Sequence, residues 1–356
     1  MVNGMGQQRS TYEAEKVVRL VVDRFLHSRT HYQATLSRLG RYYNLWRGVA
    51  PGAYDDWRNN VWIPVTHAVV AADVSHKVDL LFRRYPLVPF HGTDPAKARK
   101  WEQLIDAQMA DDNILTTATQ SLMQGDLYGV CIEQYGWKTE TQDAKIPVPL
   151  LGQDGQWTTQ YVPQTVTVFD GPMSEPVDRM DFFPQPGIRL LESMEWVVRR
   201  HLHSLETLRS WVARGWITQD AFDQLVALGS APDDDTVQSP QRWVDTWQGR
   251  ATQMRKREPH SQLVEVLEYW CVTHPAEFLE RLPEDQRDTH RRILVANRQV
   301  LLSDTPTPYR HRQLPFGVHR PIPDPHYFDA PGKVEIGAKA QATMNRLDRK
   351  STRLNS

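Results

Sequence analysis

The chain has 356 residues, of which 40% are hydrophobic and 24% are charged, proportions typical of a folded protein of one large domain or two. The formal net charge of −1 excludes a broad basic surface for nucleic acid, so any contact with DNA has to be local or confined to a channel. The opening residues have no signal-peptide core and no apolar run has the length of a membrane span, so we expect a cytoplasmic protein with no membrane contact.

Helical periodicity dominates residues 1–128. A helix is predicted to begin near Ser10, which has capping-box spacing to Glu13, and a second helical stretch ends at Gly48. Pro64 suits the first position of a third helix, which the sequence "RRYPLVPF" ends. The apolar stripe of that third helix consists of Val65, Val69, Val70, Ala72, Val74, Val78 and Leu81.

A fourth helix is predicted from its N-cap at Asp94 to Tyr128, with Pro95 in the first turn. Gly129 then ends the helix, because a positive φ at this position would turn the chain directly into a strand. One side of this helix is lined by Trp101, Leu104, Ile105, Gln108, Met109, Leu115, Ala118 and Leu122.

The period changes to two after Gly129. A hairpin that turns at Asp154-Gly155 is predicted within "IPVPLLGQDGQWTTQYV", and further strands within "TVTVFDG" and "EWVVRRHLH". Ser204 is suited to cap a helix that ends before Gly215, and a short helix follows from Phe222 to Leu228.

Residues 229–260 are polar, charged and aperiodic, which indicates a flexible linker or insertion. Strand patterns return in "QLVEVLEYWCV" and in a hairpin about Asn297. The only two cysteines, Cys131 and Cys271, lie in apolar strand-like runs and are expected to be buried free thiols. After a proline-rich stretch, a last helix is predicted to present Ile336, Ala340, Met344 and Leu347 on one side.

These elements predict an α+β fold, with a helical N-terminal half and mostly antiparallel sheets and hairpins. The predicted parts are a helical part (residues 1–128), an α+β part (129–228), a linker (229–260) and a β-rich segment that leads into a helix (261–347).

No catalytic, metal-binding or cofactor-binding residue is predicted, because the chain lacks a P-loop, a dinucleotide-binding glycine motif and His-Glu-x-x-His. His201 and His203 share one face of a predicted strand, where a metal site is conceivable, but the favoured interpretation is two histidines near a solvent face. Glu265 and Glu268 have an odd spacing, which sends them to opposite faces of a strand and argues against a catalytic carboxylate pair.

Three arginines lie close together in the proline-rich stretch. Arg310, Arg312 and Arg320 could contact phosphates, and the alternative is an ordinary solvated loop.

Five blocks follow one another along the chain: residues 41–86, 96–138, 169–211, 263–270 and 309–349. The first block contains "RYYNLWRG" and an Asn-x-x-x-Pro helix start, and the second contains a Tyr128-Gly129 junction that leads to a strand ending at Trp137. The third contains a Gly-Pro strand, and the fourth is "LVEVLEYW". The fifth contains a Pro315-Phe316 strand before a Gln-x-x-x-Asn helix that includes Asn345. In this order they resemble the portal, or head-to-tail connector, proteins of tailed bacteriophages. The chain departs from that pattern at "YFDAPG", where many relatives have Tyr-Gly.

The resemblance implies a wing-like body that packs beside copies of itself, in a ring that is typically dodecameric, at one vertex of the capsid. The implied partners are the terminase large subunit, capsid or scaffolding proteins, head-completion or tail adaptor proteins, and double-stranded DNA that passes through without sequence-specific contact. The implied location is the virion, and the host cytoplasm during assembly. The resemblance implies an architectural protein and not an enzyme, and the twelve tryptophans suit large buried or intersubunit contacts.

Residues 348–356, "DRKSTRLNS", match the conceptual translation of a common sequencing adapter, so we expect that they are not native and that the gene continues beyond about Leu347. The resemblance then implies that stem, clip and tunnel parts would follow. A genuine basic tail is the alternative.

Two other functions stay open. One is a different structural protein of a phage head or tail, such as a minor capsid or adaptor component. The other is a metal-dependent DNA-processing nuclease, which predicts that acidic residues such as Asp181 and Glu265 converge at one cleft. A deep pocket with ionisable side chains arranged around a reactant would contradict the portal hypothesis.

Overall fold

A computed structural model describes residues 2–48, 64–151, 157–228, 263–279, 284 and 287–354. Helices lie mostly in the N-terminal half, and the strands form antiparallel sheets of three and five strands, which confirms the predicted α+β class. The predicted linker and the Asp154-Gly155 turn lie outside the described residues. No helix within those ranges combines the length and hydropathy needed to cross a bilayer.

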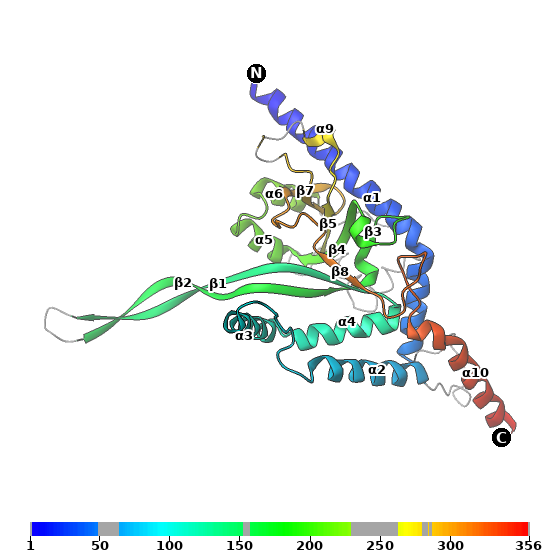
Figure 1. The fold of residues 1–356 in the computed structure, drawn as a ribbon. Helices are drawn as coiled ribbons and strands as arrows, with labels where there is room; N and C mark the ends of the chain where they lie inside the picture. Colours follow the sequence, from blue (N-terminus) through cyan, green and yellow to red (C-terminus); the bar gives the residue numbers. More distant parts are fainter. Residues whose placement is uncertain are drawn as a thin grey trace.

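The N-terminal region forms a single helix, α1 (Val2–Trp46), where the sequence predicted two. The cap predicted at Ser10 is therefore wrong, whereas the predicted end is confirmed by a φ of 76° at Gly48. The helix runs along the five-stranded sheet (Figure 1). Phe25 packs edge-on against Phe183 with ring centroids 4.7 Å apart, so this stretch of α1 is part of the core.

The next three helices are α2 (Val65–Phe82), α3 (Pro95–Asp111) and α4 (Ile114–Tyr128). Pro64 is the N-cap of α2, one position before the predicted one, and Asp94 accepts hydrogen bonds from two amides of α3 as predicted. The single helix predicted from Asp94 to Tyr128 is wrong, because Asn113 adopts a left-handed conformation with φ 54° and separates α3 from α4. α2 and α4 lie side by side (Figure 1).

Strands β1 (Cys131–Leu151) and β2 (Trp157–Val177) form a long antiparallel ribbon that projects from the body (Figure 1). Their register runs from the Ile132–Val177 pair to the Leu151–Trp157 pair, with one irregularity after Glu140. The predicted hairpin is thus part of a much longer one. Only the base gains a third strand, β8 (Phe316–His319).

The second sheet has the order β3-β4-β5-β6-β7, with all neighbours antiparallel. Its strands are β3 (Phe182–Pro184), β4 (Trp196–Ser204), β5 (Leu263–Cys271), β6 (Arg291–Ala296) and β7 (Val300–Pro306). The hairpin predicted about Asn297 is confirmed: Asn297 and Arg298 both have positive φ in the turn. Cys131 and Cys271 are buried and free, as predicted.

Two helices cover one face of this sheet. They are α5 (Leu205–Ala213) and α6 (Gln219–Leu228), and Ser204 caps α5 as predicted. Val264 and Val266 of β5 pack with these helices, whereas the alternate residues Leu267 and Tyr269 belong to the cluster that includes α1. The sheet therefore has a core on each face. Three short helices complete the described secondary structure: η2 (Arg179–Asp181), η3 (Leu191–Ser193) and α9 (Ala276–Leu279).

The last helix is α10 (Lys333–Leu354), and the expectation of a non-native tail within it stays a prediction. The predicted helix is confirmed, although its apolar residues Ile336 and Met344 are exposed, whereas Val334, Gln341 and Asn345 are buried. The Oε1 atom of Gln341 explains this orientation, because it accepts a hydrogen bond of 3.0 Å from the Thr66 amide in the first turn of α2. A side chain of α10 thereby caps the N-terminus of α2.

Candidate functional site

The Tyr128-Gly129 junction is a packing site between α4 and the chain entering α10. Gly129 has φ 82°, as predicted, and a Cβ there would lie 1.9 Å from the carbonyl oxygen of Ala330. A Cβ at Gly332 would lie 2.5 Å from the carbonyl oxygen of Leu127. The two glycines therefore allow the backbone at the end of α4 to contact the backbone before α10. The segment "YFDAPG" thus packs directly against the Tyr-Gly junction.

The other motif residues have different surroundings. Phe316 is buried, 5.2 Å from the Phe182 ring, and Pro315 precedes it at the ribbon base, where its carbonyl accepts from Tyr135. Trp137, expected in the core of a wing, is 60% exposed, because it lies where the ribbon leaves the body. Its Nε1 donates a 2.7 Å hydrogen bond to Asp170 on the neighbouring strand.

The three arginines are not gathered at one point. Arg310 and Arg312 are exposed before β8, whereas Arg320 follows β8 and is half-buried. The Arg320 guanidinium donates to the carbonyl oxygens of Phe328 and Arg189, at 2.7 and 2.9 Å. β8 thus separates Arg320 from the other two, and phosphate binding by the exposed pair stays a prediction.

Glu265 forms an ionic cluster on the α1 side of the five-stranded sheet. Its carboxylate accepts from Arg200 and Arg298, at 2.8 and 2.7 Å, and Arg200 also donates to Asp181 at 2.8 Å. Glu265 is only 1% exposed. Burial alone would raise its pKa, but the two arginines lower it. Asp181 and Glu265 do converge, on a shared arginine and not at an open cleft.

Glu268 lies on the opposite face, as its odd spacing from Glu265 predicted. It contacts His201 Nε2 at 2.9 Å and Arg292 Nε at 2.7 Å, and these partners lower its pKa against the effect of burial. His203 stacks on His201, and burial lowers the pKa of His203 to about 4. Within the described ranges, no group of three metal-ligating side chains is arranged around a common point.

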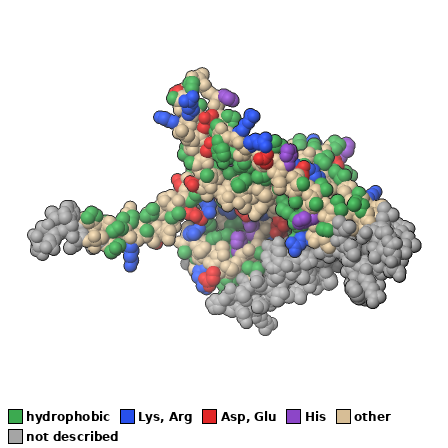
Figure 2. All heavy atoms as spheres, turned by 90° about the horizontal axis from the view of Figure 1, so that it is seen from below, with side chains coloured by type: hydrophobic (Ala, Val, Ile, Leu, Met, Phe, Trp, Pro, Cys, Tyr) green, Lys and Arg blue, Asp and Glu red, His purple; other side chains and the backbone are tan. Residues whose placement is uncertain are grey.

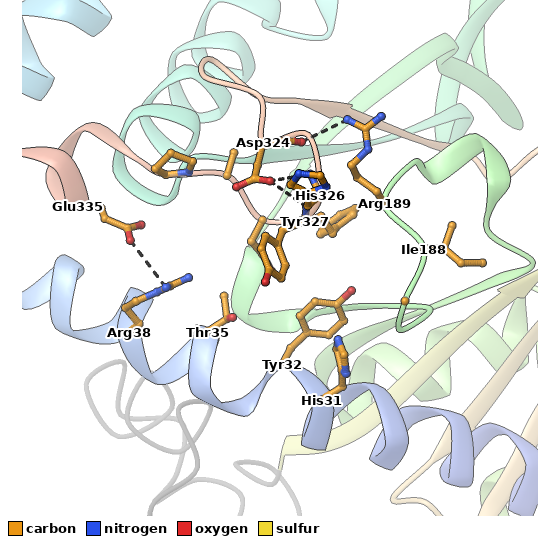
Figure 3. A pocket seen from close by; sticks show the side chains of 15 residues that line it. His31, Tyr32, Thr35, Arg38, Ile188, Arg189, Asp324, His326, Tyr327 and Glu335 are labelled. Atoms are coloured by element: carbon orange, nitrogen blue, oxygen red, sulfur yellow. Dashed lines mark hydrogen bonds and ion pairs between the residues drawn. The ribbon is translucent and has the colours of Figure 1, made fainter.

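A cavity of about 680 Å³ opens between three segments that are distant in the sequence (Figure 3). α1 supplies Tyr32 and Arg38, the loop after β3 supplies Arg189, and the segment before α10 supplies Asp324 and Tyr327. Tyr32 projects from α1 into the cavity (Figure 3) and is 7% exposed. Its hydroxyl has no hydrogen-bond partner among the described residues, and burial raises its pKa to about 12, so the hydroxyl remains a donor at neutral pH.

The acidic groups at this cavity already have partners. Asp324 accepts from the amides of His326 and Tyr327, at 2.7 and 3.0 Å, and these hydrogen bonds lower its pKa. Asp329 receives a bidentate pair of hydrogen bonds from buried Arg179, at 2.5 and 2.8 Å. Glu335, the third carboxylate at the cavity, has only a long pair with Arg38, at 3.8 Å.

Sequence reasoning missed this cavity, because no linear motif connects its three segments. One signal was present: His31, Thr35 and Arg38 recur at helical spacing, so a polar stripe lies beside the apolar face of α1. A polar stripe alone predicts only a solvated face, and the opposing wall comes from a loop near residue 327.

Hydrophobic side chains are exposed along the ribbon and over the helices beside it (Figure 2). On the ribbon these are Tyr135, Trp137, Val148, Tyr161, Val162, Val166 and Val168. On α2, α3 and α4 they are Val69, Leu80, Leu81, Trp101, Leu104 and Leu115. The apolar stripes predicted for these helices are therefore only partly buried by the described residues. On α2, for example, Val70 and Val74 are buried, whereas Val69, Leu80 and Leu81 are exposed.

No protein-family model matches this chain, and no curated protein shows significant similarity to it.

Proposed function

We propose that the chain is a subunit of a homo-oligomeric ring of the phage-portal type, with an architectural role. The observation that carries this proposal is the ribbon, whose two strands have no further sheet neighbour among the described residues beyond the base formed with β8. An isolated two-stranded hairpin is marginally stable in water, and this one exposes tyrosine and valine side chains. Such a ribbon is better explained by a partner that covers it.

A second copy of the chain suits the exposed surface. The apolar side chains of α2–α4 form a different surface from those of the ribbon, so a ribbon from one copy laid on the helices of the next gives a heterologous contact. Repeated around an axis, such a contact closes into a ring. The sequence resemblance to portal proteins independently leads to the same assembly.

The prolines of the ribbon favour contacts through its side-chain faces and not through its backbone edges. Pro147 and Pro149 in β1 and Pro163 in β2 lack the N–H group that would pair with an added strand. Prolines on an edge prevent uncontrolled sheet extension, and they leave the side-chain faces free. We therefore expect side-chain packing, and not strand addition, between neighbouring subunits.

An architectural role also accounts for the charged groups. The buried carboxylates Glu265, Glu268 and Asp329 are each held by arginine, and buried Asp126 is held by Lys77. This argues against the nuclease alternative, for which a metal would need unpaired carboxylates. As a portal-type ring, the assembly would bind terminase, capsid or scaffolding proteins and tail adaptors, and let double-stranded DNA pass.

Sedimentation velocity of the chain over a wide concentration range tests the proposal, with negative-stain microscopy of the largest species. We expect closed rings at high concentration. The double variant Tyr161→Ser, Val168→Ser should abolish them, because it removes apolar area from the ribbon face. The matched control, Val226→Ser, changes an equally exposed valine on α6 and should leave assembly unchanged. Monomers alone at every concentration would refute the ring.

A further inference from the structure

The projecting part of the ribbon and helix α3 have no buried side chain among the described residues. The described side chains of residues 135–149 and 159–170 are all exposed or half-buried. α3 is 17 residues long and buries none of them. A helix in a folded protein gains most of its stability by packing one face, and a two-stranded ribbon likewise needs cover. Within the described chain, both elements therefore lack the packing that would stabilise them.

The strand register divides the ribbon into two faces of different chemistry. Because Ile146 lies opposite Val162 and side chains alternate along a strand, the even-numbered residues of 142–148 and 162–166 share one face. This face, the valine face, consists of Gln142, Ala144, Ile146, Val148, Val162, Gln164 and Val166. The opposite face, the threonine face, consists of Thr141, Asp143, Lys145, Pro147, Pro149, Thr159, Tyr161, Pro163, Thr165 and Thr167.

Charge distinguishes the two faces. The valine face has no ionisable side chain, and Val148, Val162 and Val166 are 37%, 41% and 37% exposed. On the threonine face, Asp143 accepts a 2.7 Å hydrogen bond from the Thr165 hydroxyl. Removing uncharged side chains from water costs less than removing charged ones, so the valine face is the side of the ribbon that suits a protein partner.

The exposed side of α3 has matching chemistry. Trp101 and Leu104 lie one turn apart on the same side of the helix and are 47% and 46% exposed. α3 lies beside the ribbon of its own chain (Figure 1), yet that ribbon leaves both side chains uncovered. One chain thus presents an uncharged apolar face on its ribbon and uncovered apolar side chains on α3, and a second copy can supply the missing cover for both.

We propose that, in the assembled ring, the valine face of one subunit packs on the Trp101–Leu104 side of α3 in its neighbour, while the threonine face stays in solvent. This contact rests on the proposed ring and specifies it: one of the two ribbon faces and one of the three exposed helices form the interface. Tyr161 lies on the threonine face and outside the contact, so the effect of the double variant described above is expected to come from Val168.

Substitutions that keep the size of the ribbon side chains test the choice of face. Val162→Thr with Val166→Thr places hydroxyls on the valine face and keeps β-branched residues in the strand. It should raise the midpoint concentration of ring assembly at least about tenfold, measured by sedimentation velocity. The matched control, Thr165→Val with Thr167→Val, makes the reverse change on the threonine face and should shift the midpoint less than about twofold. Circular dichroism melts check that each variant is folded.

A double-mutant cycle tests the surface on α3. Trp101→Ala with Leu104→Ala keeps good helix formers and should by itself raise the midpoint at least about tenfold. Combined with the valine-face pair, the total effect should fall short of the product of the two by at least about threefold, because the removed side chains contact each other. Leu228→Ala changes a similarly exposed leucine on α6 and should leave the midpoint unchanged.

The possible outcomes separate this contact from the ring. Rings that the valine-face pair leaves intact, or that both ribbon pairs weaken equally, would overturn the choice of face while the proposed ring stands. Effects that simply multiply in the cycle would overturn α3 as the opposing surface. Monomers of the unchanged chain at every concentration would refute the ring itself, and this contact with it.

Discussion

The five-stranded sheet and the β1–β2 ribbon both consist of antiparallel strands, yet they differ in how far their side chains are buried and paired. In the sheet, β5 is buried on both faces, and even its charged residues Glu265 and Glu268 have arginine partners. In the ribbon, most side chains beyond the base are exposed, and Tyr161 and Val168 are not covered by any described part of the chain. The sheet therefore buries its side chains within the described structure, whereas the distal ribbon does not.

Under the proposed function, this difference would separate two tasks of one chain, folding stability and assembly. The sheet with α1 supplies folding stability, because it buries most of the apolar side chains. The base of the ribbon is tied to that body, since Arg199 of β4 donates to Glu175 of β2 at 2.5 Å. The distal ribbon contributes little buried area, and the proposed function assigns it to assembly.

The largest effect is expected from Gly129→Ala, at the contact between α4 and the chain entering α10. The new Cβ would meet the Ala330 carbonyl at 1.9 Å, and a non-glycine residue at φ 82° is strained as well. We expect a loss of more than about 4 kcal/mol in the free energy of unfolding, measured with urea. Gly187→Ala is the control, because its φ is 79° but nothing lies within 4 Å of the new Cβ. Its cost should stay near about 1 kcal/mol; equal losses would mean that strain alone, and not the backbone contact, explains Gly129.

Glu265→Gln should have the next largest effect on the free energy of unfolding, because it changes the buried ionic cluster of the five-stranded sheet. The amide cannot neutralise Arg200 and Arg298, which would leave uncompensated charge beside a buried position. A loss of about 3–5 kcal/mol in unfolding free energy is expected. The exposed pair of Glu206 and Arg209 provides the comparison: Glu206→Gln should change stability by less than about 0.5 kcal/mol. Similar values for both would show that the buried cluster is not structural.

Local signals in the sequence predicted the ends of several elements. Asp94 and Ser204 cap helices, and Gly129 and Asn297 turn the chain, because each acts through its own backbone or its nearest amides. Such interactions span only a few residues, so the sequence contains them in full. The α+β class followed from the same short-range periods.

Properties that depend on distant segments were not predicted. The buried side of α10 is set by Gln341 reaching Thr66, 275 residues away, whereas the apolar residues Ile336 and Met344 are exposed. The break at Asn113 was hidden by continuous helical periodicity on both sides. The cavity is made by three separate segments, so no local pattern in the sequence indicated it. Asp181 and Glu265 do come together, as the nuclease alternative predicted, but on Arg200 and not at a cleft.

A moderate pH dependence is expected from two histidines of the body. Burial lowers the pKa of His203 and of His274 to about 4, below the unfolded value of 6.5. Between these values the unfolded chain binds more protons, so stability is fully present above pH 6.5 and falls as the pH approaches 4. The loss should total roughly 2–4 kcal/mol, because His203 is partly exposed to solvent. Urea denaturation at several pH values measures it, and the variant His203→Phe, His274→Gln should flatten the slope. An unchanged slope would assign the effect to other groups.

The smallest effect on stability is expected in the ribbon. Tyr161→Ser and Val168→Ser remove exposed side chains, so each should lower the free energy of unfolding by less than about 1 kcal/mol. Leu267→Ala in β5 removes a fully buried side chain and should cost about 2–5 kcal/mol in the same assay. The measurement has to be made on dilute monomer, because association would add stability to the ribbon by mass action. If a ribbon variant destabilised the monomer as much as Leu267→Ala does, the ribbon would belong to the cooperative core, and its exposed face would no longer point to a neighbouring subunit.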